Sequence, residues 1–231
     1  DHEQQGLLES VDEEPLSTAS LAQVHRATLV GGRQVVVKAQ HRGVASLMRQ
    51  DMENLASIVS LVARFDKDAD FGPVVKEWSP EVLKELDFRV EATNMAEVHA
   101  LLNRRCIRAI VPAAVDELVT QRVLVMDYCE GFPIKDTARL EEEGVDRGVL
   151  LQRVCEAWAA QMHVAGVFNA DPHPGNILVS TARADGDGAD GLAAAHDPSV
   201  PVLLDFGLTK RFTPAQTVAF ARLVHASEES A

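Results

Sequence analysis

The sequence is short of cysteine and has no long apolar run. Its three cysteines, Cys106, Cys129 and Cys155, lie far apart and form no C-x-x-C pair. The sequence therefore predicts neither a disulfide framework nor a zinc site, and it favours a reducing compartment. No apolar run approaches the roughly 20 residues that a membrane-spanning helix needs. The first residues, Asp1-His2-Glu3, resemble no signal or transit sequence.

Basic residues are also scarce. Lysine and arginine number 22 against 35 aspartates and glutamates, which gives a formal net charge of −13. Nucleic-acid backbones are bound by clustered Lys and Arg, so we expect no nucleic-acid partner. Acidic residues crowd residues 3–14 and 185–197, where we expect them to be solvated. The length of 231 residues and the hydrophobic content of 46% suffice for one large domain or two lobes.

The polar pattern with the clearest chemistry lies between residues 168 and 207. Asp171 is followed five positions later by Asn176, and a later apolar run ends in Asp205-Phe206-Gly207. Protein kinases show this spacing in their H-R-D-x-x-x-x-N loop and D-F-G segment. We therefore predict that Asp171 orients the acceptor as a catalytic residue. Asn176 and Asp205 are predicted to bind Mg²⁺, which prefers oxygen ligands. The alternative is a plain turn, because Pro, Gly, Asn and Asp favour turns.

A β-hairpin is predicted upstream, where alternating and β-branched runs bracket Gly31-Gly32. The strand that follows this turn ends near Lys38, fourteen residues after Val24. This is the place of the lysine in the kinase V-A-I-K motif. We therefore predict that Lys38 pairs with the α/β-phosphates of ATP and with a helix glutamate. The alternative is a lysine that simply caps the end of a strand.

The loop before the hairpin fits the nucleotide-covering motif G-x-G-x-x-G-x-V with all three glycines replaced. Ser17, Ala19 and Ala22 stand at the glycine positions, and Val24 stands at the valine. A Cβ at each position limits positive φ and keeps the backbone farther from phosphates, so we expect a stiffer, differently seated lid. The predicted nucleotide-binding residues of this loop are Ser17, Thr18, Ala19, Ser20, Ala22 and Val24.

Two helices are predicted after the hairpin. Apolar residues recur at intervals of three and four over residues 44–65, which predicts a helix with one face buried in the core. A partner-binding stripe is the alternative for this face. The second helix is predicted to begin at Ser79-Pro80 and to run to about Arg104, because Ser can cap a helix and Pro suits its first turn.

A polar stripe lies along the second helix. Asp87, Glu91 and Asn94 are four and three positions apart, hence on one face. In kinases a helix glutamate holds the strand lysine over the phosphates, and we assign this role to Glu91. The alternative is an exposed acidic face.

The adenine is predicted to bind where a strand gives way to a polar hinge. Val123-Leu124-Val125-Met126 is followed by Asp127-Tyr128-Cys129. Backbone groups from Asp127 to Cys129 would bind the adenine, with Met126 beside it. For Met126 a plain core position is the use we favour, because Met commonly fills cores.

The remaining segments are predicted to frame the catalytic loop. A buried helix runs from Val149 to Val167 with Gly166 as its stop, and His163 near its end is expected to be packed or capping rather than catalytic. Residues 181–200 are small, acidic and Gly-rich, which predicts a disordered insertion at a hairpin tip. Thr213-Pro214 is expected to open a last helix.

Three separate peptides, in this order, resemble the aarF-domain or UbiB-type atypical kinase family over about residues 15–212. The first resembles its alanine-rich loop, the second its E-x-D motif with the lysine-pairing glutamate, and the third its catalytic loop. They are Thr18-Ala19-Ser20-Leu21-Ala22-Gln23-Val24-His25, Glu85-Leu86-Asp87-Phe88 with Glu91 and Asn94, and Asp171-Pro172-His173-Pro174-Gly175-Asn176. The resemblance makes Gln23, Glu85, Asp87 and His173 family-motif residues.

The resemblance implies an α+β, bilobal protein-kinase-like fold, with an antiparallel N-lobe sheet, extra helices and a partial, mostly helical C-lobe. We expect an acidic lead-in over residues 1–14, the N-lobe over 15–127 and the hinge and C-lobe over 128–231. ATP and Mg²⁺ are the implied cofactors, and ATPase or small-molecule kinase activity in isoprenoid-quinone (ubiquinone-type) or lipid metabolism is the implied function. The same resemblance implies a lipid or quinone-like partner, peripheral membrane association and a mitochondrial or plastid location.

Some features depart from the family pattern. Asn169 stands where many relatives have His, no Arg precedes Asp171, and no A-P-E segment appears. Regulation by loop phosphorylation is therefore unsupported. The family's K-x-G-Q segment, expected before residue 15, is absent from this sequence.

Three functions remain open. The first is an ATP-dependent phosphotransferase or ATPase. The second is a nucleotide-binding pseudokinase scaffold for a lipid or protein partner, which the alanine-rich loop favours and the filled catalytic positions disfavour. The third is a small-molecule kinase of the aminoglycoside or choline type, which the loop and Glu85-Leu86-Asp87 disfavour. The phosphoryl acceptor is open among a quinone precursor, a lipid, a protein hydroxyl and water.

Overall fold

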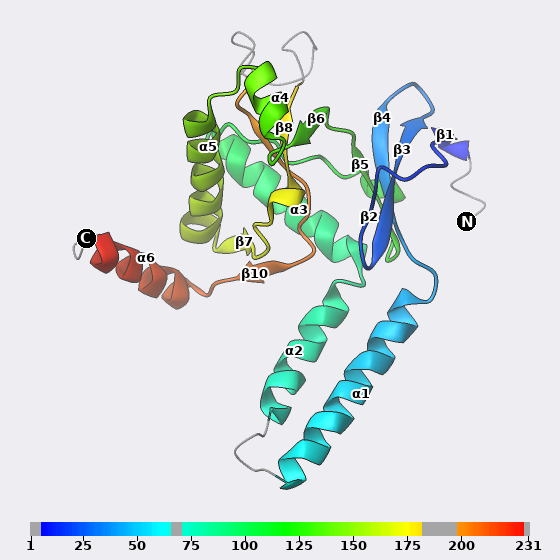
Figure 1. The fold of residues 1–231 in the computed structure, drawn as a ribbon, viewed down its shortest axis with the longest axis vertical. Coiled ribbons are helices and arrows are strands. Elements are labelled where there is room, and N and C mark those ends of the chain that lie inside the picture. Colours follow the sequence, from blue (N-terminus) through cyan, green and yellow to red (C-terminus); the bar gives the residue numbers. More distant parts are fainter. Residues whose placement is uncertain (1–5, 66–70, 182–197, 229–231) are drawn as a thin grey trace. The chain divides into compact units, whose positions relative to one another are not determined.

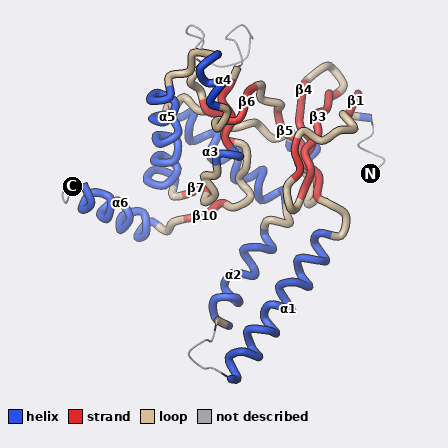
Figure 2. Tube along the Cα trace, in the orientation of Figure 1, coloured by secondary structure: helices blue, strands red, loops and turns tan. Residues whose placement is uncertain are grey.

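The computed structural model describes residues 6–65, 71–181 and 198–228 (Figure 1). The chain divides into two units. Unit 1 comprises Asp1–Ala92 and Ala114–Met126, and unit 2 comprises Thr93–Ala113 and Asp127–Ala231. Antiparallel strands and helices occur in both units (Figure 2), as expected for an α+β fold. Most of the insertion expected at residues 181–200 lies outside the described residues.

Unit 1 contains a sheet in the order β1-β3-β4-β5, with β2 paired to β3. The β3-β4 hairpin is antiparallel and turns through Gly31 and Gly32, whose φ values of 100° and 87° favour glycine. This confirms the predicted hairpin, and it sets Lys38 opposite Val24. The strands are β1 (Leu8–Val11), β2 (Ser17–Thr18), β3 (Ala22–Leu29), β4 (Gln34–Gln40) and β5 (Val123–Asp127). Strand β1 lies within the stretch expected to be an acidic lead-in.

The core of unit 1 forms where the sheet meets the turn that follows residue 114. Side chains from β3, β4 and β5 pack there against the 3-10 turn Asp116–Leu118. The buried members of this cluster are Ala27, Val35, Val115, Leu118 and Val125. Lys38 lies on β4, and the packing of Val35 in this cluster holds β4 in place.

Helices α1 (Val44–Phe65) and α2 (Gly72–Lys84) lie side by side as a pair (Figures 1 and 2). The bounds of α1 match the prediction. Its predicted burial is wrong, because none of its residues, all of which the structure describes, is buried. Leu47, Ile58 and Phe65 have 59%, 60% and 86% of their surface exposed. The apolar spacing identified a helix with an apolar stripe, but in the described part of the chain the contact with α2 leaves these three residues exposed.

The predicted start of the second helix at Ser79 is also wrong. Ser79 and Pro80 lie inside α2, and the Ser79 hydroxyl donates to the Val75 carbonyl at 2.7 Å instead of capping a new helix. A hydroxyl bonded to the preceding turn is a common use of serine within helices. The Ser-Pro pair is therefore an ambiguous start signal.

Three residues, 85–87, separate the end of α2 from the start of α3 (Phe88–Arg104). The carboxylate of Asp87 accepts a hydrogen bond from the backbone N–H of Arg89 at 3.1 Å. Asp87 thus acts at the N-terminus of α3 as a capping residue. One of the three residues expected on a helix face lies before the helix, while Glu91 and Asn94 lie within it and are buried.

Unit 2 combines two small sheets with helices. One sheet has the order β6-β8-β9 and the other pairs β7 with β10. The strands are β6 (Gly131–Pro133), β7 (Val167–Asn169), β8 (Ile177–Ser180), β9 (Pro201–Leu203) and β10 (Thr209–Arg211), and the helices are α4 (Thr137–Glu142), α5 (Arg147–Ala160) and α6 (Pro214–Glu228). A cluster of buried residues joins β6, β8, α4 and α5, namely Phe132, Leu140, Val145, Leu150 and Val179. The predicted last helix is confirmed as α6.

Helix α5 runs without a break into a π-helical turn, Gln161–Ala165, and ends at Gly166. Gly166 has a φ of 64°, so the predicted glycine stop is confirmed. His163 stacks on Phe220 with ring centroids 5.4 Å apart, which confirms its packing role. The helix is predicted to be buried, but its Leu151 is 63% exposed. No helix among the described residues has the length and apolar character that crossing a membrane requires.

Candidate active site

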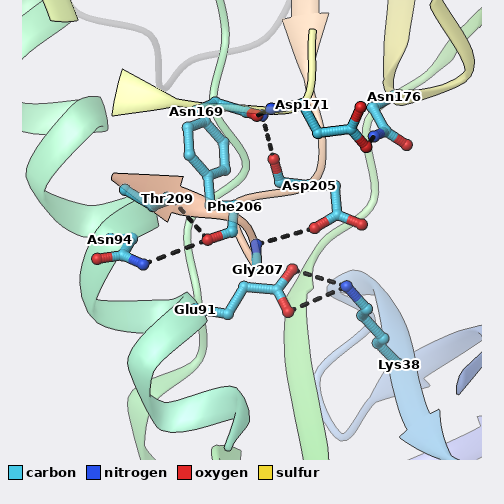
Figure 3. Close-up of polar contacts among 10 residues, drawn as sticks. All are labelled: Lys38, Glu91, Asn94, Asn169, Asp171, Asn176, Asp205, Phe206, Gly207 and Thr209. Carbon is cyan, nitrogen blue, oxygen red and sulfur yellow. Dashed lines mark hydrogen bonds and ion pairs between the residues drawn. The ribbon is translucent and has the colours of Figure 1, made fainter. Parts of the chain in front are cut away.

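The first part of the candidate site is an ion pair in unit 1. The Lys38 ammonium donates to both carboxylate oxygens of Glu91, at 2.8 and 3.0 Å (Figure 3). The side chains of Lys38 and Glu91 are 14% and 3% exposed. The Phe88 ring lies with its centroid 5.2 Å from the ammonium, within the range of a cation–π contact. The predicted partner of Lys38 is therefore the one that the structure gives it.

The start of α3 is fixed to the sheet near this pair. The side-chain amide of Gln40, at the end of β4, donates to the Leu86 carbonyl at 2.8 Å. Asp87 binds the Arg89 guanidinium at 2.8 and 2.6 Å, and these hydrogen bonds hold the pKa of the Asp87 carboxyl below its usual value. Glu85 ends α2 with its backbone N–H bonded to Val82. Glu85 and Asp87 thus lie at the two ends of the turn between α2 and α3, just before the helix that carries Glu91.

The alanine-rich loop is bound to its own sheet. Ser17 and Thr18 form β2 and pair with Val24 and Gln23 of β3. The Ala19 N–H donates to the Ala22 carbonyl at 2.8 Å.

One further contact anchors this loop. The Ala19 carbonyl lies 3.0 Å from Nε2 of His41, which follows β4. A carbonyl can only accept, so His41 donates this bond. Because backbone groups of the loop are engaged on both sides of Ser20, the loop is tethered to the hairpin that carries Lys38.

The second part of the candidate site is the loop between β7 and β8 in unit 2. The Asn176 side chain donates from Nδ2 to the Asp171 carboxylate at 3.2 Å (Figure 3). His173 caps the 3-10 turn Pro174–Asn176, because its Nδ1 accepts from the Gly175 N–H at 3.0 Å. A Cβ at Gly175 would lie 2.8 Å from that nitrogen. The sequence Asp-Pro-His-Pro-Gly-Asn is therefore a shaped turn that brings its two polar ends together.

The Asp205-Phe206-Gly207 segment is held by hydrogen bonds to three of its backbone groups. The Gly207 N–H donates to the Asp205 carboxylate at 2.9 Å. The Asn169 amide donates to the Asp205 carbonyl. The Asn94 amide and the Thr209 hydroxyl donate to the Phe206 carbonyl, at 3.2 and 2.7 Å. The Phe206 side chain is fully buried, so the segment is fixed on both the backbone and the side-chain side.

The residues of unit 2 fit a magnesium ion that also binds phosphate. The amide nitrogen of Asn176 is engaged with Asp171, which leaves its oxygen as the atom suited to a cation. Asp205 supplies a carboxylate. Among the described residues no group of three or more His, Cys, Asp or Glu side chains could hold a metal ion unaided. Mg²⁺ commonly takes one or two protein oxygens and completes its shell with water and phosphate, so this donor set suits it.

The predicted adenine contacts lie at the boundary of the two units in the sequence. The Asp127 N–H donates to the Ala113 carbonyl at 2.9 Å, so this donor is used within the fold. Met126 is buried at 5% exposure, as a core residue would be. Burial, and after it the nearby Asp127 charge, raises the pKa of the Cys129 thiol to about 11. Cys129 is therefore a neutral thiol at physiological pH.

Two residues that support the site were not singled out by sequence reasoning. Gln161 is fully buried and His41 holds the alanine-rich loop. A glutamine inside an apolar helix and a histidine after a strand have many uses, so neither gave a sequence signal. The sequence shows Asn169 as a departure from the family pattern, but it does not predict the hydrogen bonds of Asn169 to Asp171 and Asp205.

The chain matches proteins of known family. The family model described as the ABC1 atypical kinase-like domain matches residues 2–229. AarF domain-containing protein kinase 1 of Gallus gallus is 32% identical over 218 residues, which covers 94% of this chain and 40% of that protein. The probable protein kinase UbiB of Azotobacter vinelandii is 32% identical over 214 residues, covering 91% and 37%. The chloroplastic protein ACTIVITY OF BC1 COMPLEX KINASE 8 of Arabidopsis thaliana is 35% identical over 178 residues, covering 75% and 23%.

Solved structures show the same fold. Rv3197 of Mycobacterium tuberculosis, in complex with erythromycin, matches with a TM-score of 0.67 and 24% identity, covering 90% of this chain and 48% of that one. The Rio2 kinase of Chaetomium thermophilum, as an ADP/Mg²⁺-phosphoaspartate complex, matches with a TM-score of 0.52 and 15% identity, covering 96% and 55%. The predicted protein-kinase-like fold is confirmed. The chain spans less than half the length of each curated relative named here.

Proposed function

The chain belongs to the family of ABC1 atypical kinase-like domains, and we propose that it binds ATP with Mg²⁺ and transfers or hydrolyses the γ-phosphoryl group. The observation that carries this proposal is the two-oxygen pairing of Lys38 with Glu91. An ammonium held this way keeps a fixed position, which is what a lysine that binds ATP phosphates requires.

Four residues would have separate roles in phosphoryl transfer. Lys38 would neutralise charge on the α/β-phosphates. The carboxylate of Asp171, turned by Asn176, would accept the proton of the attacking hydroxyl or water. The new bond joins that oxygen to the γ-phosphorus as the bond to the β-phosphate oxygen breaks, and ADP leaves. Asn176 and Asp205 would hold Mg²⁺, which when bound offsets the charge that develops on the phosphate oxygens.

The family also supports a proposal for the partner and the location. We propose that this activity supports isoprenoid-quinone or lipid metabolism in a mitochondrion or plastid, with a lipid or quinone-like molecule as partner at a membrane surface. The support is membership of a family that includes a probable protein kinase UbiB and a chloroplastic kinase.

Mg²⁺-dependent ATP consumption by single-residue variants tests the proposal. Lys38→Met and Asp205→Asn should each lower turnover by roughly 100-fold or more, because catalysis here depends on placed charge. Lys84→Met is the matched control, since Lys84 pairs with Glu81 at the surface and is 62% exposed. Adding lipid vesicles or quinone-like phenols, and identifying any phosphorylated product, addresses the acceptor. Unchanged turnover in Asp205→Asn would refute the proposal.

A nucleotide-binding scaffold without turnover is the second candidate. The observation that favours it is the alanine-rich loop, which is paired with β3 and anchored by His41 instead of being glycine-rich and free to follow phosphates. Saturable binding of ATP with Mg²⁺ and no ADP after prolonged incubation would select this function over the first.

A further inference from the structure

Asn169 joins the two acidic loops of unit 2 through a single side chain. Its Oδ1 accepts from the backbone N–H of Asp171 at 2.7 Å, and its Nδ2 donates to the backbone carbonyl of Asp205 (Figure 3). Asn169 is only 3% exposed. One rigid amide therefore fixes the backbone at the residue proposed to take the proton and at the residue proposed to hold Mg²⁺.

Asn169 is itself fixed by the end of helix α5. Oε1 of Gln161 accepts from the Asn169 N–H at 3.1 Å, and its Nε2 donates to the Ala157 carbonyl at 3.1 Å. The indole N–H of Trp158 donates to the Asn169 carbonyl at 3.0 Å. Both backbone groups of Asn169 are thus bound by side chains of one helix, and both polar atoms of the Gln161 side chain are used.

Gln161 reaches Asn169 from an unusual piece of backbone. It is fully buried and begins the π-helical turn Gln161–Ala165. A π-turn is a rare interruption of an α-helix and often occurs at functional sites. Burying two amide side chains is costly unless every polar atom is paired. An apolar pair would fill the same core space, but it could not fix the backbones of two loops.

We propose that Gln161 and Asn169 are positioning residues that set the spacing between Asp171 and Asp205. This inference rests on the proposed function of these two aspartates. In this proposal neither amide has a contact with the nucleotide. Gln161 sets the Asn169 backbone, Asn169 sets the two aspartate backbones, and the aspartates act on the substrate and the metal. Residues that orient metal-binding groups in this way typically affect metal affinity or activity by 10–100-fold.

Substitutions of Asn169 can remove its two side-chain hydrogen bonds separately or together, so each bond can be tested. In Asn169→Asp the acceptor for the Asp171 N–H is kept, but the donor to the Asp205 carbonyl is lost. In Asn169→Ala both are lost. A neutral imidazole has one donor and one acceptor nitrogen, so Asn169→His can make both bonds and serves as the rescuing variant. Gln161→Met keeps the size of Gln161 without its hydrogen bonds, and Gln152→Met on the exposed side of α5 is its control.

The first measurement is backbone amide hydrogen exchange of the full chain without nucleotide. Asn169→Ala should speed exchange at the Asp171 amide by roughly 10-fold or more because its acceptor is gone. Asn169→Asp should leave that amide protected. Gln161→Met should speed exchange at the Asn169 amide, and Gln152→Met should change neither. Unchanged exchange at Asp171 in a folded Asn169→Ala protein would overturn the inference, whether or not the parent chain turns over ATP.

The second measurement is the kinetic split between kcat and KM in Mg²⁺-dependent ATP turnover. Asn169→Asp, Asn169→Ala and Gln161→Met should lower kcat by roughly 10- to 100-fold and raise the Mg²⁺ concentration for half-maximal rate. The KM for ATP should change little, and Asn169→His should retain most of the rate. Variants that keep the parental kcat and Mg²⁺ requirement would overturn the inference. A parent without turnover would instead overturn the proposed function, and the exchange comparison would then decide the inference alone.

Discussion

The Glu91 carboxylate accepts two hydrogen bonds from the Lys38 ammonium at a buried position, where the Glu91 side chain is 3% exposed. Removing one partner of a buried ion pair costs about 3–5 kcal/mol, because the other charge is left without compensation. Glu91→Gln should fall near the low end of this range, since Gln still offers one acceptor and Lys38 keeps some contact with water. We expect the free energy of unfolding to fall by about 3 kcal/mol in urea titrations.

Glu141→Gln provides the matched control for this change. Glu141 pairs with Arg147 at 2.8 Å on the surface, and both side chains are more than half exposed. Exposed ion pairs contribute about 0–1 kcal/mol. Equal losses of stability in the two variants would contradict the special role of the Lys38–Glu91 pair.

The contact between His41 and the Ala19 carbonyl predicts a change in the mobility of the alanine-rich loop. His41→Leu removes the donor, so the amides around Ala19 should exchange faster with solvent, and the KM for ATP should change more than kcat. His25→Leu is the control, because its ring bonds the Asp12 carbonyl instead. Equal exchange rates for Ala19 in both variants would show that the histidine does not anchor the loop.

The contact between Asn94 and the Phe206 carbonyl predicts a loss of stability. Asn94 also accepts from Arg211 at 3.2 Å, so Asn94→Leu breaks two hydrogen bonds at a buried position. The Phe206 carbonyl keeps the Thr209 hydroxyl as a partner. Thermal and urea unfolding should show a loss of about 1–3 kcal/mol. Arg211→Met removes the Arg211 hydrogen bonds to Asn94 and Glu97 but keeps the buried bond from Asn94 to Phe206, so it should cost less than Asn94→Leu. The reverse order would contradict the importance of the buried bond.

The raised pKa of Cys129 predicts slow alkylation. Its thiol titrates at about 11, whereas Cys106 and Cys155 are exposed. Because the thiolate is the reactive form, iodoacetamide at pH 8 should label Cys106 and Cys155 first. Mass spectrometry of the labelled peptides should show Cys129 reacting appreciably only as the pH approaches 11. Equal labelling of all three cysteines in the native protein would contradict the raised pKa of the Cys129 thiol.

The lowered pKa of Asp87 predicts a pH-dependent contribution to stability. A carboxyl whose folded pKa lies below its unfolded value stabilises the fold above the unfolded pKa, and this stabilisation is lost as the pH falls through the folded pKa. The hydrogen bond from the Arg89 side chain lowers the pKa of the Asp87 carboxyl below its ordinary value of 3.8. Asp87→Asn should therefore be less stable than the parent at pH 7, and the difference should shrink below pH 3.8. A difference that stays constant with pH would mean that the charge of Asp87 is not involved.

Sequence reasoning succeeded where local chemistry leaves one solution. The glycine pair between β-branched runs set the β3-β4 hairpin, and the spacing from Val24 identified Lys38. Glu91 could be chosen as its partner because kinases pair the strand lysine with a helix glutamate, and the structure places Glu91 within hydrogen-bond distance of Lys38. Gly166 ended its helix as expected, since a positive φ is cheapest for glycine.

Sequence reasoning failed where the outcome depends on the rest of the molecule. The apolar spacing of α1 gave its bounds but not its exposure, because periodicity records a stripe and not what covers it. Ser79-Pro80 predicts a helix start, but the Ser79 hydroxyl bonds the preceding turn of α2, and Asp87 makes the capping hydrogen bond of α3. Gln161 could not be found, because its role arises from a π-turn and from a strand that follows it.

Two asparagines from different parts of unit 2 hydrogen-bond the backbone next to the Phe206 ring. Asn169 donates to the Asp205 carbonyl, and Asn94 donates to the Phe206 carbonyl. Turning the Phe206 ring out of its buried place would require rotating peptide groups that both asparagines restrain. Small molecules that bind by displacing the Phe206 ring should therefore bind poorly. Compounds that leave the ring in its buried position do not require these peptide groups to rotate.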